Sequence, residues 1–489
     1  MPVIPKPLHC RATGAAPFVL DTTARVVAGD EHLRGPAELL ADRLHAPVGA
    51  TERPGDIRLR LGDPDTGATT GFARREAYRL SVTSDAVTIV GATAAGVFRG
   101  TQTLLQLLPG PIAATEITDH PRLAERGLML DPARSFLTVA DVERVIDGLV
   151  MVKANRLHLH LTDDQSWRLE IRSWPRLAEH SRAGAVAGCP SGVYSQADYA
   201  EIVRYAADRY ITVVPEIDVP GHTTAAVSAY PRLGLGQRPV PLMTSDGVGT
   251  VSLDVGSDLT YTFLDDVVRE VAELTPGPYL HLGGDEVTGL SDEQYTTFLH
   301  RARRIVTAYG KTMIAWTPAP RTGLDPSVVH HYWADRAGDM SPAWFAGDRP
   351  VILSPTLHAY LDYGFAPGES IGIKYTDRTC RAAYDWDPAA VRDETTGCDL
   401  TTGYGLTEAQ TQGIEAAVWG ETMRRGRPDV ERAIWPRLAG LMEKAWSPPA
   451  TFDDHARRLA RFGTQLRAAG ITFWPDPEIP WTGPAGRGI

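Results

Sequence analysis

Two stretches of the sequence decide the fold: Ile211-Thr-Val-Val-Pro-Glu-Ile-Asp218 and Arg156-Leu-His-Leu-His-Leu-Thr-Asp-Asp164. Each contains a short run rich in β-branched residues or leucine, and each ends in carboxylates. Near-continuous apolar runs of this length are typical of strands that are buried on both faces of a parallel sheet. We therefore expect a parallel sheet whose strands end in charged residues.

Runs of the same kind recur through the rest of the chain. Candidate strands lie at residues 127–131, 156–161, 211–218, 279–283, 312–316, 328–333, 351–354 and 415–419. Helical patterns lie at residues 139–153, 197–209, 261–274, 292–309 and 432–446. This α/β alternation over about 330 residues predicts a (β/α)8 barrel of the TIM type. An open, doubly wound sheet is the alternative, but no glycine-rich phosphate turn follows the first strand.

The N-terminal part of the chain has a different pattern. Residues 57–61, 78–82 and 86–90 alternate between apolar and polar side chains, as half-buried strands do. Residues 37–44 and 95–108 predict helices, and Pro109-Gly-Pro111 interrupts the second one. We expect a small α+β domain at residues 1–115, followed at residues 116–489 by the barrel and C-terminal helices.

Composition narrows the possible partners. Among 489 residues there are 49 Lys and Arg against 60 Asp and Glu, a formal net charge of −11. This balance disfavours nucleic acid, because phosphate binding needs a basic surface. No apolar run is long enough to span a bilayer, so we expect no membrane partner. The first residues lack the apolar core of a secretory signal, so we expect a cytoplasmic protein, or a secreted one whose signal is missing from this chain.

The most informative strand end is His281-Leu-Gly-Gly-Asp-Glu286. Two adjacent carboxylates in a dry cleft repel each other, so one of them should have a raised pKa and could act as a general acid. The two glycines allow the backbone to turn sharply before the carboxylates. A structural alternative is that Asp285 and Glu286 begin a helix, where acidic residues are favourable.

Three other predicted strands end in tryptophan: Trp316, Trp333 and Trp419. Indole faces stack on the apolar faces of sugar rings, and nearby carboxylates accept hydrogen bonds from sugar hydroxyls. A single tryptophan more often fills a core. Three of them at one rim of a barrel favour a carbohydrate pocket.

The same rim could instead bind a divalent metal ion. The candidate ligands are His158, His160, Asp163, His222, Asp285 and His331. Two of them, His158 and His160, would point to the same side of a strand. No pair shows the tight spacing of a motif such as HExxH, so we expect no metal.

Three sequence blocks resemble the signatures of glycoside hydrolase family 20, the β-N-acetylhexosaminidases. They are His158-Leu-His-Leu-Thr-Asp-Asp-Gln-Ser-Trp-Arg168, Pro215-Glu-Ile-Asp-Val-Pro-Gly-His222 and His281-Leu-Gly-Gly-Asp-Glu286. The resemblance spans nearly the whole chain and implies an accessory α+β domain before a catalytic barrel. It also implies retaining exo-hydrolysis of terminal β-linked GlcNAc or GalNAc, with a carbohydrate as partner and no cofactor.

The resemblance implies how the catalytic residues would work. Glu286 would be the general acid and base. Asp285 would orient the substrate's 2-acetamido group, whose carbonyl oxygen attacks the anomeric carbon to give an oxazolinium intermediate. Tyr360 would donate a hydrogen bond to that oxygen. The chain departs from the family pattern at Thr317 and Pro318, because many members have an acidic residue after this tryptophan.

The resemblance also implies which residues bind the substrate. Trp316, Trp333 and Trp419 would form the walls of the acetamido pocket and the stacking floor, Arg134, Asp362 and Glu421 would contact ring hydroxyls, and Asp163 with His222 would tune Glu286.

Other functions stay open on the sequence alone. An enzyme of the same fold could release a disaccharide, as a lacto-N-biosidase does, or act on a modified GlcNAc. A sugar-binding protein would not need the catalytic residues, and a metal-dependent hydrolase would need the ligands named above. Residues 364–399 are expected to form a rim loop that shapes specificity. Pairing of Cys380 with Cys398 would favour an oxidising compartment, and the sequence leaves that pairing open.

Overall fold

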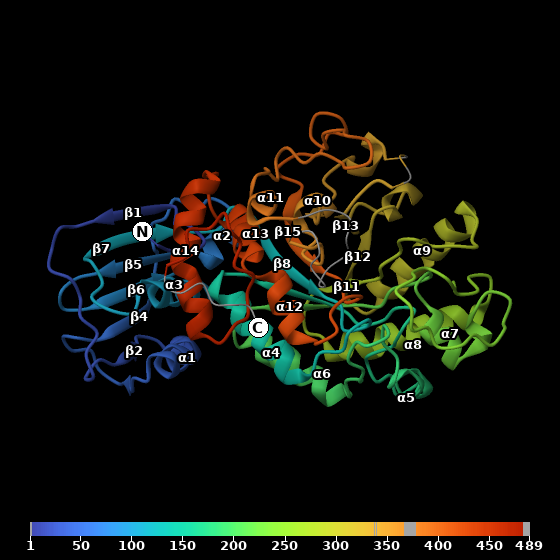
Figure 1. Ribbon diagram of the computed structural model, residues 1–489, viewed down its shortest axis with the longest axis horizontal. Coiled ribbons are helices and arrows are strands. Elements are labelled where there is room, and N and C mark those ends of the chain that lie inside the picture. The colour runs from blue at the N-terminus through green and yellow to red at the C-terminus, as the bar shows by residue number, and fades with distance from the viewer. Residues whose placement is uncertain (1, 337, 339, 366–377, 483–489) are drawn as a thin grey trace.

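The computed structural model describes residues 2–482 except 337, 339 and 366–377. It contains an N-terminal mixed sheet and a closed parallel barrel, which lie side by side along the long axis of the molecule (Figure 1). The fold class expected from the sequence, a TIM-type barrel preceded by a small α+β domain, is confirmed.

The described N-terminal residues form a seven-stranded sheet in the order β1-β7-β5-β6-β4-β2-β3. Its elements are β1 His9–Ala12, β2 Val26–Ala28, η1 Glu31–Leu33, α1 Arg34–Leu44, β3 Val48–Gly49, β4 Ile57–Leu61, α2 Gly71–Glu76, β5 Tyr78–Val82, β6 Val87–Gly91, α3 Ala94–Leu107 and β7 Thr115–Asp119. The three strands and two helices expected here are present as β4, β5, β6, α1 and α3. The division of the chain into domains near residue 115 stays a prediction.

Within the described part of the chain, eight parallel strands close a barrel in the order β10-β11-β12-β13-β14-β15-β8-β9. They are β8 Glu125–Leu130, β9 Arg156–His160, β10 Thr212–Glu216, β11 Tyr279–His281, β12 Thr312–Trp316, β13 Val329–Tyr332, β14 Val351–Leu353 and β15 Thr411–Val418. Every predicted barrel strand is present, and the differences are confined to the strand ends.

The remaining described helices connect these strands or follow the last one. They are α4 Val139–Met151, α5 Arg176–Ser181, α6 Gln196–Ala207, α7 Thr224–Ala229, η2 Pro231–Leu233, α8 Asp258–Leu274, α9 Asp292–Ala308, η3 Ala319–Thr322, η4 Pro342–Phe345, α10 Thr356–Ala359, α11 Cys380–Tyr384, α12 Arg427–Ile434, α13 Arg437–Trp446 and α14 Phe452–Ala468. The expectation of one helix at residues 432–446 is wrong. Pro436 separates α12 from α13, because proline lacks the N–H group that a continuous helix requires.

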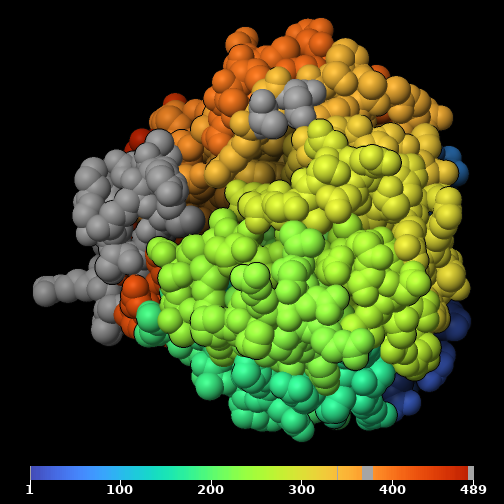
Figure 2. All heavy atoms as spheres, turned by 90° about the vertical axis from the view of Figure 1, so that its right-hand side faces the viewer, coloured from blue at the N-terminus to red at the C-terminus, as the bar shows by residue number. Residues whose placement is uncertain are grey.

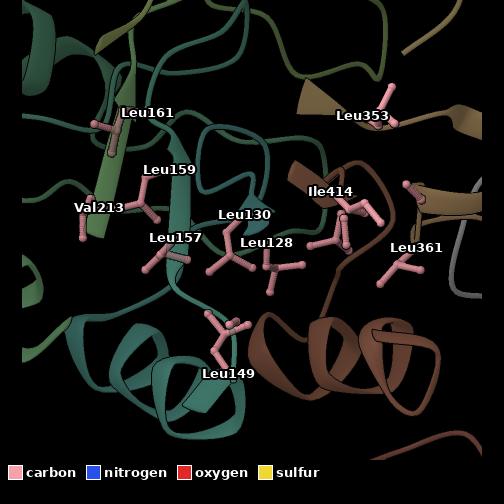
Figure 3. Close-up of a cluster of buried hydrophobic side chains, with 14 of the residues drawn as sticks. Leu128, Leu130, Leu149, Leu157, Leu159, Leu161, Val213, Leu353, Leu361 and Ile414 are labelled. Carbon is pink, nitrogen blue, oxygen red and sulfur yellow. The ribbon is translucent and has the colours of Figure 1, made fainter. Parts of the chain in front are cut away.

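A leucine-rich core joins the barrel to its helices. Leu128 and Leu130 of β8 and Leu157 and Leu159 of β9 are fully buried, and Leu149 of α4 belongs to the same cluster (Figure 3). Burial of one leucine side chain contributes about 2 kcal/mol to the stability of the folded state. A rigidly packed barrel of this kind holds the carboxyl ends of its strands in fixed positions.

Three expectations on segments and cysteines can be compared with this fold. No described helix combines the length and apolarity that crossing a bilayer requires. All four cysteines, Cys380 and Cys398 included, are free thiols. Of the expected rim loop, residues 366–377 lie outside the described residues, and the remainder includes α11.

Candidate active site

The candidate site residues collect where the barrel strands end. Figure 2 shows the end of the molecule opposite the N-terminal sheet, where green and yellow segments from the middle of the chain meet orange segments that follow β13 and β14. Arg134, Asp163, His222, Asp285, Glu286, Trp316, Trp333, Tyr360, Asp362, Trp419 and Glu421 all end a barrel strand or follow one. The structure thus brings every predicted site residue to this face of the barrel.

A strained turn after β11 presents the two adjacent carboxylates. Gly283, Gly284 and Glu286 have φ values of +61°, +93° and +49°. This left-handed region is easy for glycine and costly for glutamate, so the surroundings must hold the turn. The Gly284 N–H donates to Oδ1 of Asp218 at 3.0 Å, and the Tyr295 hydroxyl donates to the Gly284 carbonyl. The side chain of Glu286 is 29% exposed, whereas Asp285 is buried.

Asp285 is the member of the pair whose pKa is raised. Burial, together with the carboxylates of Glu286 and Glu216, raises the pKa of Asp285 to about 7, although His222 opposes this shift. Its Oδ1 atom has no hydrogen-bond partner among the described residues. A buried acceptor without a partner is rare in native proteins and suggests a place for a ligand donor.

His222 connects Asp163 to Glu286. Its Nδ1 lies 3.2 Å from Oδ2 of Asp163, and its Nε2 lies 3.9 Å from Oε2 of Glu286. Asp163 also accepts from Nε2 of His160 at 2.8 Å and pairs with Nη2 of Arg134 at 2.8 Å. Burial disfavours the imidazolium, but Asp163 and Asp218 outweigh it and raise the pKa of His222 well above its usual range. These two carboxylates therefore favour the charged form of His222.

Four aromatic side chains form a box beside the carboxylates. Trp333 and Tyr360 are nearly parallel, with ring centroids 6.4 Å apart, and Trp419 lies 6.1 Å from both Tyr360 and Trp316. The indole N–H of Trp316 donates to Oε1 of Glu216 at 2.8 Å, and that of Trp333 donates to the Thr317 carbonyl at 2.9 Å. Hydrogen bonds within the protein thus fix the indole N–H groups of both tryptophans.

A second group of polar residues lies near Trp419. The guanidinium of Arg134 lies 5.3 Å from the Trp419 ring and is held by Asp131 and Gln165. Burial raises the pKa of Glu421 to about 7, although Arg134 opposes this shift. Both carboxylate oxygens of Asp362 and Oε2 of Glu421 are buried without a partner among the described residues. These acceptors fit a ligand that brings hydroxyl donors.

The predicted metal ligands are divided among four clusters in the described chain rather than collected in one. The clusters are His158, His281 and His331; His160, Glu216 and Asp218; Asp163, Asp218 and His222; and His222, Asp285 and Glu286, each with donor atoms within 4.8 Å of one another. Hydrogen bonds within the protein already engage many of these atoms. For example, Nδ1 of His158 lies 2.7 Å from Oε1 of Glu415, and Nε2 of His331 lies 2.7 Å from the Ser354 hydroxyl.

The residue-by-residue prediction missed several supporting residues. Glu216 and Asp218 lie in the block Pro215-Glu-Ile-Asp-Val-Pro-Gly-His222, but the block alone does not indicate their contacts. Their spacing of two was the available signal, because residues i and i+2 of a strand point to the same side. Gln165 donates to the carbonyls of Ser245 and Gly247 while it accepts from Arg134, and no sequence pattern indicated this link.

A cavity of about 200 Å³ adjoins Glu286. Its lining includes Val287, Trp333 and Arg336, together with Thr317 and Pro318, the two residues that depart from the family pattern. Nη1 of Arg336 lies 3.7 Å from Oε1 of Glu286. The space next to the candidate acid can therefore hold another chemical group.

Comparison with known proteins agrees with this geometry. Residues 124–295 and 288–449 match the family model for the catalytic domain of glycosyl hydrolase family 20, and residues 1–120 match the model for domain 2 of that family. The chain belongs to glycosyl hydrolase family 20. It is therefore a glycoside hydrolase, and the resemblance noted in the sequence is confirmed.

Similar family 20 proteins extend over the same length. A β-N-acetylhexosaminidase from Cellulomonas fimi is 36% identical, covering 99% of this chain and 97% of that protein. The solved GH20 β-N-acetylhexosaminidase from Streptomyces coelicolor A3(2) is 37% identical with a TM-score of 0.90, covering 98% of this chain and 99% of the other. A mutant β-hexosaminidase from Streptomyces plicatus, solved in complex with product (GlcNAc), is 38% identical with a TM-score of 0.90, covering 98% of each chain.

Proposed function

We propose that this family 20 hydrolase is a retaining exo-β-N-acetylhexosaminidase that acts by substrate-assisted catalysis. One observation carries the proposal: a buried carboxyl group, Asp285, and a partly exposed one, Glu286, lie beside the aromatic box. The two groups have different surroundings and can have different roles. The names of the relatives from Cellulomonas fimi and Streptomyces coelicolor, and the GlcNAc complex of the Streptomyces plicatus protein, support the choice of sugar.

In the first step, the oxygen of the substrate's 2-acetamido group attacks the anomeric carbon. The bond to the glycosidic oxygen breaks, and Glu286 gives its proton to that oxygen. In the second step, the Glu286 carboxylate takes a proton from water, whose oxygen attacks the same carbon and opens the oxazolinium ring. Each step inverts the configuration at the anomeric carbon, so the two steps together retain it, and Glu286 is again protonated.

Asp285 and the aromatic box position the nucleophile. Asp285 accepts from the acetamido N–H and stabilises the positive charge that develops on this group, while Tyr360 donates to its oxygen. Trp316 and Trp333 confine the methyl group and exclude water. Because the nucleophile is part of the bound substrate, holding it in place supplies a large effective molarity.

The polar group around Arg134 favours a terminal sugar. Asp362 and Glu421 offer buried acceptors without protein partners, and Arg134 offers a donor whose position is held by its neighbours. These residues match the hydroxyls of one ring at the non-reducing end. The leaving group would then extend past Glu286 into the adjoining cavity.

Two aryl glycosides test the proposal. The expected result is release of nitrophenol from 4-nitrophenyl β-N-acetylglucosaminide but not from 4-nitrophenyl β-glucoside, which lacks the acetamido nucleophile. Proton NMR should show the β-anomer as the first product. Equal cleavage of both glycosides would contradict the proposal, since the reaction would then not need the acetamido group. Cleavage of disaccharide glycosides alone would indicate a lacto-N-biosidase-like enzyme.

A further inference from the structure

Glu216, the last residue of β10, occupies the inside of the barrel below the candidate site. It is fully buried, and four side chains surround its carboxylate. Oε1 accepts from Nε1 of Trp316 at 2.8 Å and lies 3.2 Å from Nδ1 of His281. Oε2 lies 2.6 Å from Nδ1 of His160 and 2.9 Å from Nε2 of His158. Each oxygen therefore belongs to a different branch of contacts.

The Oε1 branch leads to the aromatic box. Trp316 is 1% exposed, and its ring stacks on His331 with centroids 3.7 Å apart. Its N–H donates to Oε1 of Glu216. One carboxylate oxygen therefore holds the polar edge of this indole, while the His331 ring packs against its face.

The Oε2 branch leads to the candidate acid. Nδ1 of His160 contacts Glu216, and Nε2 of the same ring lies 2.8 Å from Asp163. Asp163 contacts His222, which in turn faces Glu286. The groups alternate in sign, since Glu216 and Asp163 are acidic and both histidines have pKa values raised well above the usual range. Such alternation compensates for burying charges.

We propose that Glu216 is a positioning residue that couples the acetamido pocket to the proton relay. It does not touch the substrate. It fixes Trp316 through one oxygen and His160 through the other, so that the nucleophile and the acid keep one relative geometry. This inference rests on the proposed function, because it assigns the two branches to the two halves of that mechanism.

Glu415 offers a matched control inside the same barrel. Its Oε1 lies 2.7 Å from Nδ1 of His158 and 3.8 Å from Nε2 of His331, the ring on which Trp316 stacks. Glu216→Gln and Glu415→Gln thus remove one buried carboxylate each from neighbouring positions. Both substitutions keep the side-chain shape, and thermal melting shows whether each variant folds.

The experiment compares two substrates. 4-Nitrophenyl β-N-acetylglucosaminide depends on the acetamido nucleophile but little on acid assistance, whereas N,N′-diacetylchitobiose depends on both. Glu216→Gln should lower kcat/KM about 10-fold on the first and about 100-fold on the second, mainly through kcat. Glu415→Gln should stay within about threefold of the wild type on both.

Single-branch variants complete the design. Trp316→Phe should lower kcat/KM by the same factor on both substrates, and His160→Asn should act mainly on chitobiose. Equal losses for Glu216→Gln and Glu415→Gln, or a Glu216→Gln loss that is the same on both substrates, would overturn the inference.

Two further controls keep the inference testable. The wild type is assayed first, and absence of turnover contradicts the proposed function and this inference together. If the wild type turns over but Glu216→Gln and Glu415→Gln lose activity equally, the inference alone is contradicted. If Glu216→Gln does not fold, a double-mutant cycle between Trp316→Phe and His160→Asn replaces it. Coupling of the two losses is then expected, and strict additivity overturns the inference.

Discussion

Nε2 of His222 faces Oε2 of Glu286 at 3.9 Å, while Nδ1 of the same ring lies 3.2 Å from Asp163. The first distance is too long for a hydrogen bond, so the interaction is electrostatic. With Glu286 as the proposed acid, a protonated imidazole in this position would stabilise the carboxylate that remains after Glu286 gives up its proton. The effect of His222 should then depend on how much acid assistance a substrate needs.

Glu286→Gln removes the proposed acid and should be selective between substrates. We expect kcat/KM to fall about 10³-fold on chitobiose and far less on the 2,4-dinitrophenyl glycoside, whose leaving group needs little protonation. Glu293→Gln, an exposed glutamate at the start of α9, is the control and should behave as the wild type. Equal losses on the two substrates would show that Glu286 is not the acid.

His222→Asn should reproduce this selectivity in a weaker form. It removes the charge that faces Glu286 but leaves the acid in place, so we expect about a 10- to 100-fold loss on chitobiose and a smaller loss on the dinitrophenyl glycoside. The ratio of the two kcat/KM values is the readout. A ratio that stays at the wild-type value would contradict the proposed action of His222 on Glu286.

Asp285→Asn should affect kcat more than KM. In the proposed mechanism the acetamido group acquires charge only on the way to the oxazolinium ion, so Asp285 would stabilise the transition state more than the bound substrate. We expect kcat to fall about 10²-fold or more with a change in KM of a few fold. Steady-state kinetics with the nitrophenyl substrate measure both, and a pure KM effect would contradict the role.

Glu421→Gln should change how stability depends on pH. The pKa of Glu421 is raised to about 7 in the folded protein, above its value of about 4.5 in the unfolded chain. The folded state therefore binds more protons between these values, and the free energy of unfolding falls as the pH rises through this window. Glutamine does not titrate, so the free energy of unfolding of the variant lacks this dependence on pH.

We therefore expect Glu421→Gln to raise Tm at pH 7.5 relative to the wild type and to raise it less at pH 5. Activity should fall at the same time, because Glu421 is proposed to accept a hydrogen bond from a sugar hydroxyl. Melting curves at the two pH values measure the difference. An identical pH dependence of Tm in the wild type and the variant would contradict the raised pKa of Glu421.

Local patterns predicted the barrel well. Its strands are short and buried on both faces, which distinguishes them from helices. The prediction failed where one residue mattered, at the Pro436 break between α12 and α13. Strands such as β1 (His9–Ala12) and β3 (Val48–Gly49) were missed because they are short and lack buried alternation.

The candidate site was predicted by its motifs but not by its internal contacts. The adjacent carboxylates predicted one raised pKa and a general acid at the same residue. Burial raises the pKa of Asp285, whereas Glu286 is the residue proposed as the acid, so the sequence pattern did not assign the two roles. The contact of Glu216 with Trp316 joins residues 100 positions apart, and it exists only because the barrel closes. No local pattern can indicate such a contact.

The most direct test of substrate-assisted catalysis is inhibition by the thiazoline analogue of GlcNAc, which mimics the oxazolinium intermediate. Turnover of 4-nitrophenyl β-N-acetylglucosaminide is measured with and without this compound. We expect competitive inhibition much tighter than substrate binding in the wild type, and strongly weakened inhibition in Asp285→Asn. Turnover that the thiazoline leaves unchanged would contradict substrate-assisted catalysis.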